Sequence, residues 1–190
     1  MKEYSIPHDK VMYTWYMPHD LCDDLIDYYE SSPHKQKGKI GDGIHEHVKK
    51  STDVSLDFHS PLFRDYSDEL QKGLEVYQDR YPTLREESRF DNLNESTNIQ
   101  KYLPGEGFFK VHSERENNPV QIKRVLVYMT YLNDCENAGT YWPYVDVKIP
   151  HAEKGLSVLW SADYTYAHQG LTENVNDIKY IATGWLSYVE

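Results

Sequence analysis

The sequence predicts an α+β fold that is mainly β, with a jelly-roll core (a double-stranded β-helix) in the C-terminal half that N-terminal helices brace. Two observations support this prediction. Apolar residues recur at helical spacing before residue 82. From residue 98 onward, short runs rich in Val, Ile, Tyr, Thr and Trp are separated by turn signals such as Pro-Gly, Asn-Asp and Lys-Gly. We therefore expect several short strands around a buried site.

Two amphipathic helices that brace a sheet are expected in the N-terminal half. The first begins near Asp20, since aspartate is a favoured N-cap, and ends before Pro33. Its apolar face comprises Leu21, Leu25, Ile26 and Tyr29. The second opens at Ser60 and Pro61, because proline is tolerated in a first turn, and continues to Pro82. Its apolar stripe comprises Phe63, Tyr66, Leu70, Leu74 and Tyr77.

The segment between these helices, residues 34–50, is rich in lysine, histidine and glycine, which is typical of a mobile loop or a short hairpin. A solvated loop is favoured over a lid. His45 and His47 alternate on one face around Glu46. No partner pattern accompanies them, so the sequence favours a solvated surface there over a second metal site.

The strands of the C-terminal half follow from their composition. Residues 122–132 are apolar at nearly every position, as expected for a strand that is buried on both faces. Residues 155–160 and 178–189 supply further strands, since β-branched and aromatic side chains are frequent in them. The number of strands stays open.

Length and composition indicate one domain. With 190 residues and 39% hydrophobic content, the chain can bury one sizeable core, and nothing requires a second one. We expect a single domain over residues 1–190. Residues 1–97 would form a helical support, and residues 98–190 would form the metal-binding jelly-roll core.

The charge balance argues against nucleic acid as a direct partner. Acidic residues outnumber basic ones by 31 to 20, and the net charge of −11 would repel a phosphate backbone. No apolar run reaches the ~20 residues that cross a bilayer, and the charged first ten residues contain Pro7. A soluble, cytoplasmic protein is expected. Cys22 and Cys135 are too few for a disulfide framework, so reduced packing cysteines are expected.

Two histidines and a carboxylate form the candidate metal site. Alternate side chains of a strand share one face, so His112 and Glu114 are expected to point the same way from one strand. His168, from a distant strand, would complete a facial set of two nitrogens and one oxygen that leaves open coordination positions. Oxygen activation requires such positions. A catalytic zinc site also uses two histidines and a carboxylate, so ligand type alone leaves the metal open.

Lys179 narrows the choice of chemistry. On the expected strand it shares a face with Ile181, Thr183 and Trp185. A lysine among apolar neighbours is costly without an anion, and a carboxylate ligand would supply one. A dicarboxylic keto acid fits, because its keto-acid end can take two metal positions while its far carboxylate reaches Lys179.

Several motifs follow one another in a specific order and spacing. They are Lys101-Tyr102-Leu103-Pro104-Gly105 before His112, then Arg124 through Tyr131-Leu132-Asn133-Asp134, then Ala138-Gly139-Thr140, then His168-Gln169-Gly170 followed by Lys179-Tyr180 and Trp185. Through these motifs, residues 98–188 resemble the iron(II)- and 2-oxoglutarate-dependent dioxygenases of the prolyl 4-hydroxylase type.

This resemblance implies a role for each matching residue. Iron would be held by His112, Glu114 and His168. Lys179 would pair with the far carboxylate of 2-oxoglutarate. Tyr102 and Tyr131 would line the pocket of that cosubstrate, and Arg124 and Trp185 would face the substrate.

The sequence departs from the family pattern at two places. Glu114 stands where the family usually has aspartate, so its longer arm must fold back to keep ligand geometry. Glutamate also occurs there in some related oxygenases, and we interpret it as a variant. In residues 138–141 the family more often has two glycines followed by Glu-Thr, although the turn stays recognisable.

Together the residues and the resemblance predict a hydroxylase that uses iron(II), 2-oxoglutarate and O2 on a C–H bond. A prolyl residue of a peptide or protein is the favoured substrate. Two alternatives stay open: a jelly-roll binding module without catalysis, and a cupin-like metalloenzyme that does not use 2-oxoglutarate. Single residues also have other readings, namely core packing for Tyr102 and Trp185 and ion pairing or a surface place for Arg124. The oligomeric state stays open.

Overall fold

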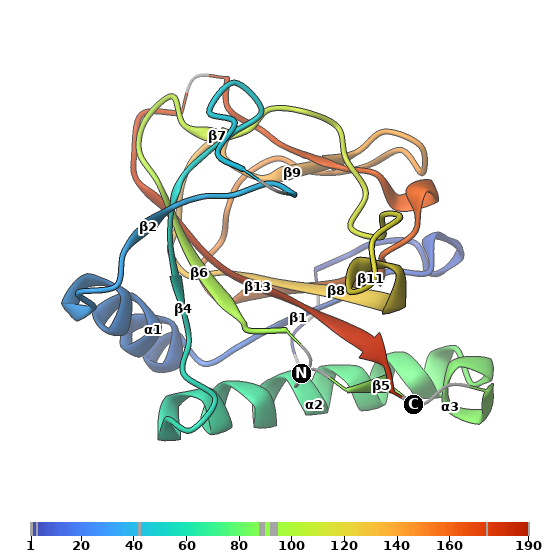
Figure 1. Ribbon diagram of the computed structural model, residues 1–190. Helices are drawn as coiled ribbons and strands as arrows, with labels where there is room; N and C mark the ends of the chain where they lie inside the picture. Colours follow the sequence, from blue (N-terminus) through green and yellow to red (C-terminus); the bar gives the residue numbers. More distant parts are fainter. Residues whose placement is uncertain are drawn as a thin grey trace.

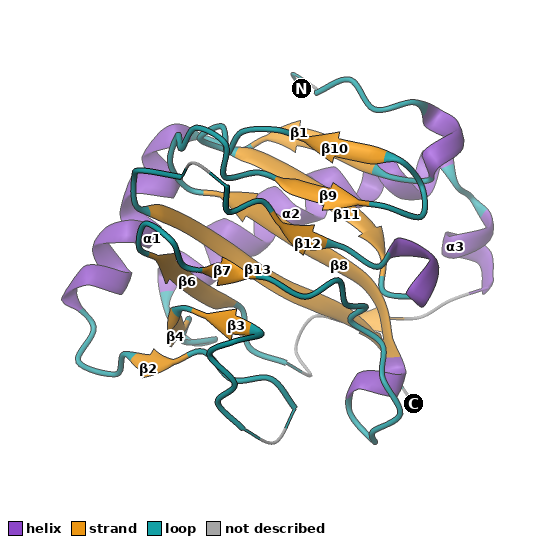
Figure 2. Ribbon diagram, turned by 90° about the horizontal axis from the view of Figure 1, so that it is seen from above, coloured by secondary structure: helices purple, strands orange, loops and turns teal. Residues whose placement is uncertain are grey.

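The structure is a computed structural model that describes residues 2, 4–41, 43–87, 90–91, 95–173 and 175–189. An eight-stranded sheet lies at its centre, with two long helices against one face and smaller sheets over the other (Figure 1). Viewed from above, the three short strands β9, β10 and β12 cross over this sheet (Figure 2). The mainly β architecture with bracing helices confirms the predicted fold class.

The main sheet joins strands from both halves of the chain. It consists of β1 (Tyr13–Tyr16), β2 (Gln36–Lys37), β4 (Thr52–Ser55), β5 (Phe90–Asp91), β6 (Asn98–Tyr102), β8 (Arg124–Tyr131), β11 (Leu156–Ser161) and β13 (Lys179–Tyr188). Their order is β1-β11-β8-β13-β6-β4-β2, and β5 pairs with β13. Every pair is antiparallel. The N-terminal part therefore supplies strands as well as the expected helical support.

Two smaller sheets and the helices complete the fold. One sheet has the order β10-β9-β12, formed by β9 (Thr140–Trp142), β10 (Val147–Ile149) and β12 (Gln169–Gly170). The other pairs β3 (Lys49–Lys50) with β7 (Gly107–Phe108). The helices are α1 (His19–Ser31), α2 (Pro61–Arg80) and α3 (Thr83–Glu87), with short 3-10 turns η1 (His8–Lys10), η2 (Gln121–Lys123) and η3 (Tyr164–Tyr166).

The two long helices begin for different reasons. Helix α2 starts as predicted, because the Ser60 hydroxyl accepts a hydrogen bond from the backbone N–H of Phe63 at 3.0 Å and Pro61 follows it. The prediction that Asp20 caps α1 is wrong. Pro18 holds the N-cap position without a side-chain bond, and Asp20 lies inside the first turn. Among the described residues, no helix is long and apolar enough to cross a membrane.

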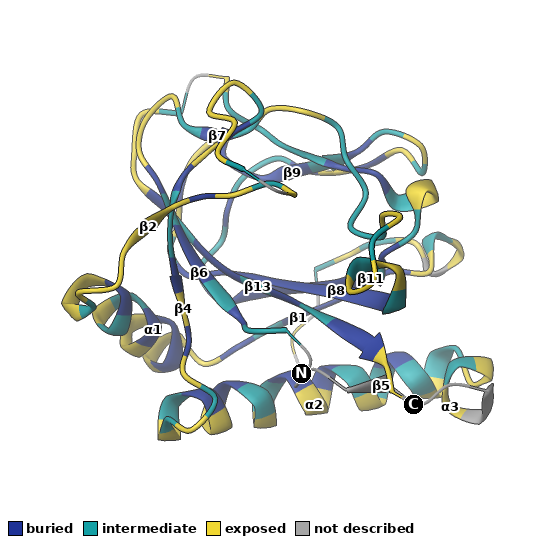
Figure 3. Cartoon of the chain, in the orientation of Figure 1, coloured by how far each residue is buried: buried dark blue, intermediate teal, exposed yellow. Residues whose placement is uncertain are grey.

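Side chains pack in two core clusters on opposite faces of the main sheet. The helix-side cluster includes Leu126 and Tyr128 of β8, and the cluster under the smaller sheets includes Val127 and Met129 of the same strand. This alternation follows from the two-residue period of a strand. Figure 3 shows the result, since the central strands are buried whereas the outer faces of the helices are exposed. The cluster under the smaller sheets surrounds the site described next.

Some expected boundaries differ from the observed ones. The strand expected to carry both His112 and Glu114 stops at Phe108, where β7 ends, and residues 109–114 are mostly irregular. The strand expected from residue 122 starts at Arg124, after the turn η2. Turn formation at residues 118–123 explains this shift, because Asn118 Oδ1 accepts from the backbone N–H groups that follow it.

Candidate metal centre

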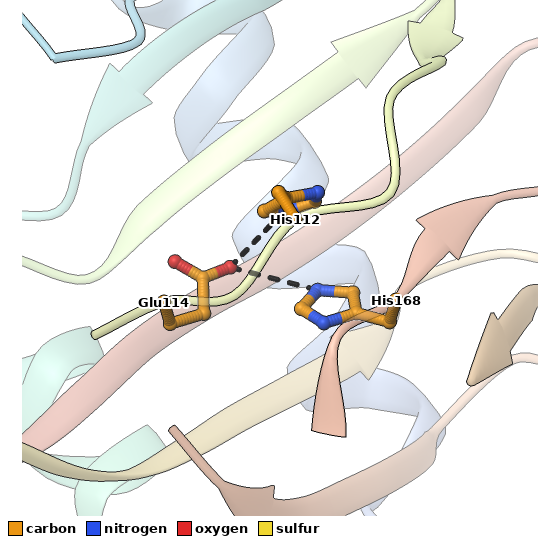
Figure 4. A group of neighbouring side chains, drawn as sticks. All are labelled: His112, Glu114 and His168. Carbon is orange, nitrogen blue, oxygen red and sulfur yellow. Dashed lines mark ion pairs between the residues drawn. The ribbon is translucent and has the colours of Figure 1, made fainter. Parts of the chain in front are cut away.

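The structure brings the three predicted ligands together. One potential ligand atom from each of His112, Glu114 and His168 lies within 4.8 Å of the others. Glu114 Oε1 lies 3.3 Å from His112 Nε2 and 3.5 Å from His168 Nε2. Figure 4 shows this one carboxylate oxygen facing both imidazole rings. No other group of three such side chains was found among the described residues.

An isolated backbone bridge, outside the named strands, places the two histidines side by side. The backbone N–H of His112 donates to the carbonyl of His168 at 3.0 Å, and the N–H of His168 donates to the carbonyl of His112 at 2.8 Å. This isolated antiparallel bridge fixes the separation of the two main chains. The three residues are neighbours as the sequence predicted, although His112 lies outside the regular strand that was expected to carry it.

Each imidazole has its second nitrogen occupied by the backbone. His112 Nδ1 lies 3.0 Å from the carbonyl oxygen of Lys110, and His168 Nδ1 lies 3.2 Å from that of Tyr166. A carbonyl can only accept, so each Nδ1 carries the proton and each Nε2 has a free lone pair. Metal-binding histidines are commonly oriented in this way.

The spacing fits one small metal ion. Ligand atoms that lie ~2.1 Å from an ion at right angles to each other are separated by about 3 Å. The two nitrogen-to-oxygen distances in the structure, 3.3 and 3.5 Å, need only a small contraction to meet this value. Two nitrogens and one oxygen suit Fe(II) and also Zn(II).

Electrostatics keep these groups in the protonation states that a metal requires. Burial raises the pKa of Glu114, but the neighbouring His112, His168 and Arg124 more than offset this, so the net pKa lies well below the usual range. Burial lowers the pKa of His168 to about 3, and His112 adds to the effect. At neutral pH, Glu114 is therefore a carboxylate and His168 is uncharged.

The three residues line a cavity of about 790 Å³ between the main sheet and the smaller sheets. Several of the other predicted site residues line the same cavity: Tyr102, Arg124, Lys179 and Trp185. Ile181 and Thr183 line it as well, which agrees with the face that the sequence assigned to them. The wall also includes residues of the segment 34–50, so this segment is more than a solvated loop.

Lys179 is a buried cation in the wall of this cavity. Its exposed fraction is 6%, and its Nζ donates to the carbonyl of Ala138 at 3.0 Å. The ring centroid of Tyr102 lies 4.9 Å from the same Nζ. No described carboxylate forms an ion pair with it, and burial lowers its pKa to about 8. An ammonium group in this setting lacks an anion.

The two tyrosines predicted for the cosubstrate pocket differ in position. Tyr102 lines the cavity, and its hydroxyl donates to Gln100 Oε1 at 2.5 Å. Tyr131 is not among the described residues that line the cavity. Its hydroxyl is 2.7 Å from Thr140 Oγ1, and Thr140 does line the cavity. Tyr131 therefore supports the wall from behind.

Arg124 and Trp185 contact Glu114 directly. Trp185 Nε1 donates to Glu114 Oε2 at 3.0 Å, and Arg124 lies 3.4 Å from that oxygen. Arg124 also forms an ion pair with Glu95. Arg124 is therefore an ion-pair partner, which was one of the alternatives considered for it. The alternative of a surface position is wrong, because Arg124 is buried.

The sequence analysis did not identify three residues that support the site: Glu95, Phe108 and Lys49. Glu95 pairs with Arg124, and the Phe108 ring stacks on His112 with centroids 3.5 Å apart. Lys49 is buried in the cavity wall and pairs with Asp53 at 2.8 Å. Composition concealed Lys49, since it lies at the end of a lysine-rich segment that resembles an exposed loop.

No family model matches the chain, and no curated protein is similar to it in sequence. Solved structures are similar in fold. A viral collagen prolyl hydroxylase from Paramecium bursaria Chlorella virus-1, in complex with 2OG, aligns over 97% of this chain and 100% of its own, with 17% identity and a TM-score of 0.66. The chain has the prolyl hydroxylase fold.

Two further structures support this assignment of the fold. A Pseudomonas putida prolyl-4-hydroxylase aligns over 96% of this chain and 99% of its own, with 15% identity and a TM-score of 0.67. A Trichoplax adhaerens prolyl hydroxylase, in complex with a hypoxia inducible factor peptide fragment, aligns over 94% of this chain and 84% of its own, with 12% identity and a TM-score of 0.68. The prolyl hydroxylase fold therefore extends over nearly the whole chain, including the N-terminal helices.

Proposed function

We propose that the protein is an iron(II)- and 2-oxoglutarate-dependent dioxygenase that hydroxylates a C–H bond. One observation carries this proposal: the ammonium group of Lys179, which has no ion-pair partner among the described residues, lines the same cavity as the His112, Glu114 and His168 cluster. A metal site alone does not require a buried cation, whereas a chelating keto acid with a second carboxylate does. The fold, shared with prolyl hydroxylases, supports the proposal.

The donor set fits iron(II) with two further reactants. Three protein ligands leave three of six octahedral positions, which suffice for a two-point chelate and for O2. The bound metal would supply the redox chemistry in which 2-oxoglutarate and O2 are converted to succinate and CO2 while one oxygen atom enters a C–H bond. His112 and His168 would bind through Nε2, and Glu114 through Oε1.

The other residues would bind and orient the cosubstrate. Lys179 would donate a charge-assisted hydrogen bond to the far carboxylate of 2-oxoglutarate. Tyr102 would cover that carboxylate, since its ring lies against Lys179 in the same cavity wall. Thr140, held by Tyr131, would form another part of the wall. These contacts would exclude water from the reacting end.

A prolyl residue in a peptide or protein is the substrate that we propose. The fold is shared with several prolyl hydroxylases, one of which holds a peptide fragment. The cavity, at about 790 Å³, has room for more than a keto acid. Screening proline-rich peptides by mass spectrometry tests this: a single added oxygen that depends on 2-oxoglutarate would support it. Keto-acid decay without any modified prolyl peptide would point to another substrate.

We also propose that residues 1–190 act as one domain in the cytoplasm. Strands before residue 98 pair with strands after it, as β1 does with β11 and β4 does with β6. The two cysteines, Cys22 and Cys135, are free and buried, which suits a reducing compartment. The net charge of −11 favours a peptide over a nucleic acid as partner.

An anaerobic titration tests the proposed activity. Iron(II) and 2-oxoglutarate are added to the apoprotein, and the visible charge-transfer band of a metal-chelated keto acid is followed. We expect the band in the wild type and in His151→Ala, because His151 pairs with Glu136 at the surface. We expect no band in His168→Ala.

The possible results separate the three functions considered. A band in the wild type that His168→Ala loses supports the dioxygenase. Bound metal without a band favours a cupin-like enzyme that does not use 2-oxoglutarate. Failure to bind metal at all favours a binding module without catalysis. Iron-dependent keto-acid turnover that survives His168→Ala would contradict the assignment of the site.

A further inference from the structure

A β-bulge turns the side chain of Arg124 toward the cavity. Between β13 and β8, Trp185 lies opposite Val127 and Leu186 opposite Leu126, but Ser187 lies opposite Arg124, so no residue of β13 lies opposite Val125. Both Val125 and Leu126 pack in the helix-side core. Regular alternation would have sent Arg124 to that side too, whereas the extra residue re-aims it.

Arg124 and Trp185 then hold the outer oxygen of Glu114 between them. The guanidinium carbon of Arg124 lies 3.6 Å from the ring centroid of Trp185, so the two groups stack. Trp185 Nε1 donates to Glu114 Oε2 at 3.0 Å, and Arg124 donates to the Glu114 carbonyl at 2.9 Å. With Arg124 also 3.4 Å from Glu114 Oε2, this oxygen faces two donors, while Oε1 faces the two histidines.

Glu95 fixes the other side of the guanidinium. Arg124 Nε donates to Glu95 Oε1 at 2.8 Å, and a second nitrogen bonds the other oxygen of the same carboxylate. The side chains of Arg124 and Glu95 are exposed by only 7% and 12%. A guanidinium bound in this two-point manner keeps one orientation. Arg124 is therefore committed to two carboxylates of its own chain and is not free for a substrate.

A glutamate ligand needs such support more than an aspartate does. The extra methylene adds a rotatable bond, and fixing it costs conformational entropy. An unsupported glutamate can also turn to bind an ion through both oxygens, which would consume one open position. Donors on Oε2 oppose that rotation, because it would break the bond from Trp185.

We propose that Arg124 and Trp185 are positioning residues that restrict Glu114 to a metal ligand through Oε1 alone. This inference rests on the metal site of the proposed function. It reassigns two residues whose family counterparts face the substrate, and it explains how this chain accommodates glutamate. The coordination position that a two-oxygen ligand would occupy stays open for a reactant.

Metal binding to the apoprotein tests the inference without any turnover. Mn(II) affinity is measured by calorimetry for the wild type, Trp185→Phe and Arg124→Met, and the visible absorption of the Co(II) forms reports the coordination number. Trp185→Phe keeps the ring beneath Arg124 and removes only the donor. Tyr180→Phe is the matched control, since it removes a donor to the Glu30 carboxylate from the opposite face of the same strand. Thermal unfolding verifies that each variant is folded.

We expect Trp185→Phe and Arg124→Met to weaken Mn(II) binding by about 10- to 100-fold, as outer-shell substitutions at metal sites do. Tyr180→Phe should match the wild type. The Co(II) spectrum of Trp185→Phe should change, because the carboxylate binding mode changes. In a Glu114→Asp background the shorter arm no longer reaches Trp185, so Trp185→Phe should add little further loss.

The results distinguish failure of the inference from failure of the proposed function. If the wild type binds no metal, the proposed function and this inference both fail. If the wild type binds Mn(II) but Trp185→Phe binds it equally well with an unchanged Co(II) spectrum, only the inference is overturned. An equal loss from Trp185→Phe in the wild-type and Glu114→Asp backgrounds would also overturn it.

Discussion

Lys179 and Tyr102 lie directly opposite each other on the paired strands β13 and β6, with the lysine Nζ 4.9 Å from the tyrosine ring centroid. The ring offers its negative face to a cation that has no described carboxylate partner, which partly compensates the cost of burial. This pair forms the end of the cavity that would receive the far carboxylate of a keto acid.

Lys179→Met should weaken 2-oxoglutarate binding by about 10- to 100-fold, the usual effect of losing a charge-assisted hydrogen bond. Metal binding should be retained, because Lys179 contacts none of the three ligands. The affinity is measured by titrating the charge-transfer band. Lys101→Met serves as control, since Lys101 pairs with Glu30 outside the cavity. Unchanged keto-acid affinity in Lys179→Met would remove the main support for this cosubstrate.

Binding of 2-oxoglutarate should weaken as the pH rises through about 8. Burial lowers the pKa of Lys179 to about 8, so the side chain of the free protein is an ammonium ion below that pH and an uncharged amine above it. The carboxylates of 2-oxoglutarate stay ionised over this range. Calorimetry with the Mn(II)-loaded protein measures the trend. Lys179→Met should lack it, and a pH profile that is equal in both proteins would contradict the assignment.

Lys179→Met should also stabilise the ligand-free fold at neutral pH. The pKa of Lys179 falls from 10.5 in an unfolded chain to about 8 in the fold, so the folded state binds fewer protons between these values. Unfolding free energy of the wild type therefore rises with pH across this window. Below pH 8 the buried charge costs roughly 3 kcal/mol, which the variant avoids.

Urea unfolding at several pH values measures this difference. The advantage of Lys179→Met should be full below pH 8 and should shrink as the pH approaches 10.5. A variant that is less stable than the wild type at pH 7 would show that Lys179 is compensated within the fold. The argument that Lys179 requires the carboxylate of a ligand would then fail.

Gly139→Ala should destabilise the protein by roughly 2 kcal/mol or more, because a new side chain would collide with backbone. A Cβ at this position would lie 1.8 Å from the carbonyl oxygen of Ile149, on the neighbouring strand. Gly170→Ala is the control, since its Cβ would lie 3.7 Å from the nearest atoms. Thermal unfolding compares the two, and equal melting temperatures would refute the steric argument.

The sequence predicted the fold class from local patterns, and it predicted the clustering of the candidate ligands from motifs whose order resembles that of a known family. Alternation on β13 correctly placed Lys179, Ile181 and Trp185 on the cavity face. Order and spacing of motifs indicated that His112 and His168 belong together. The two-residue step from His112 to Glu114 needed only an extended chain, so the loss of the expected strand did not separate these side chains.

Long-range geometry could not be predicted in the same way. The orientation of Arg124 depends on a register shift between β8 and β13, and composition does not reveal such a shift. The partner of Arg124, Glu95, lies in an irregular segment without a pattern. Tyr131 lies on the face of β8 that is directed toward the cavity, yet Thr140 from another strand lies between its hydroxyl and the cavity. In each case a tertiary neighbour decided the outcome.

The division of β8 and β13 between two core clusters has a consequence for how this scaffold can evolve. Leu126, Ala182 and Leu186 pack beneath the helices, while Met129 and Thr183 face the cavity. Substitutions at the cavity positions can alter which substrates bind, while the core beneath the helices still holds the strands in place. Substrate preference can therefore diverge within an unchanged framework, one alternate residue at a time.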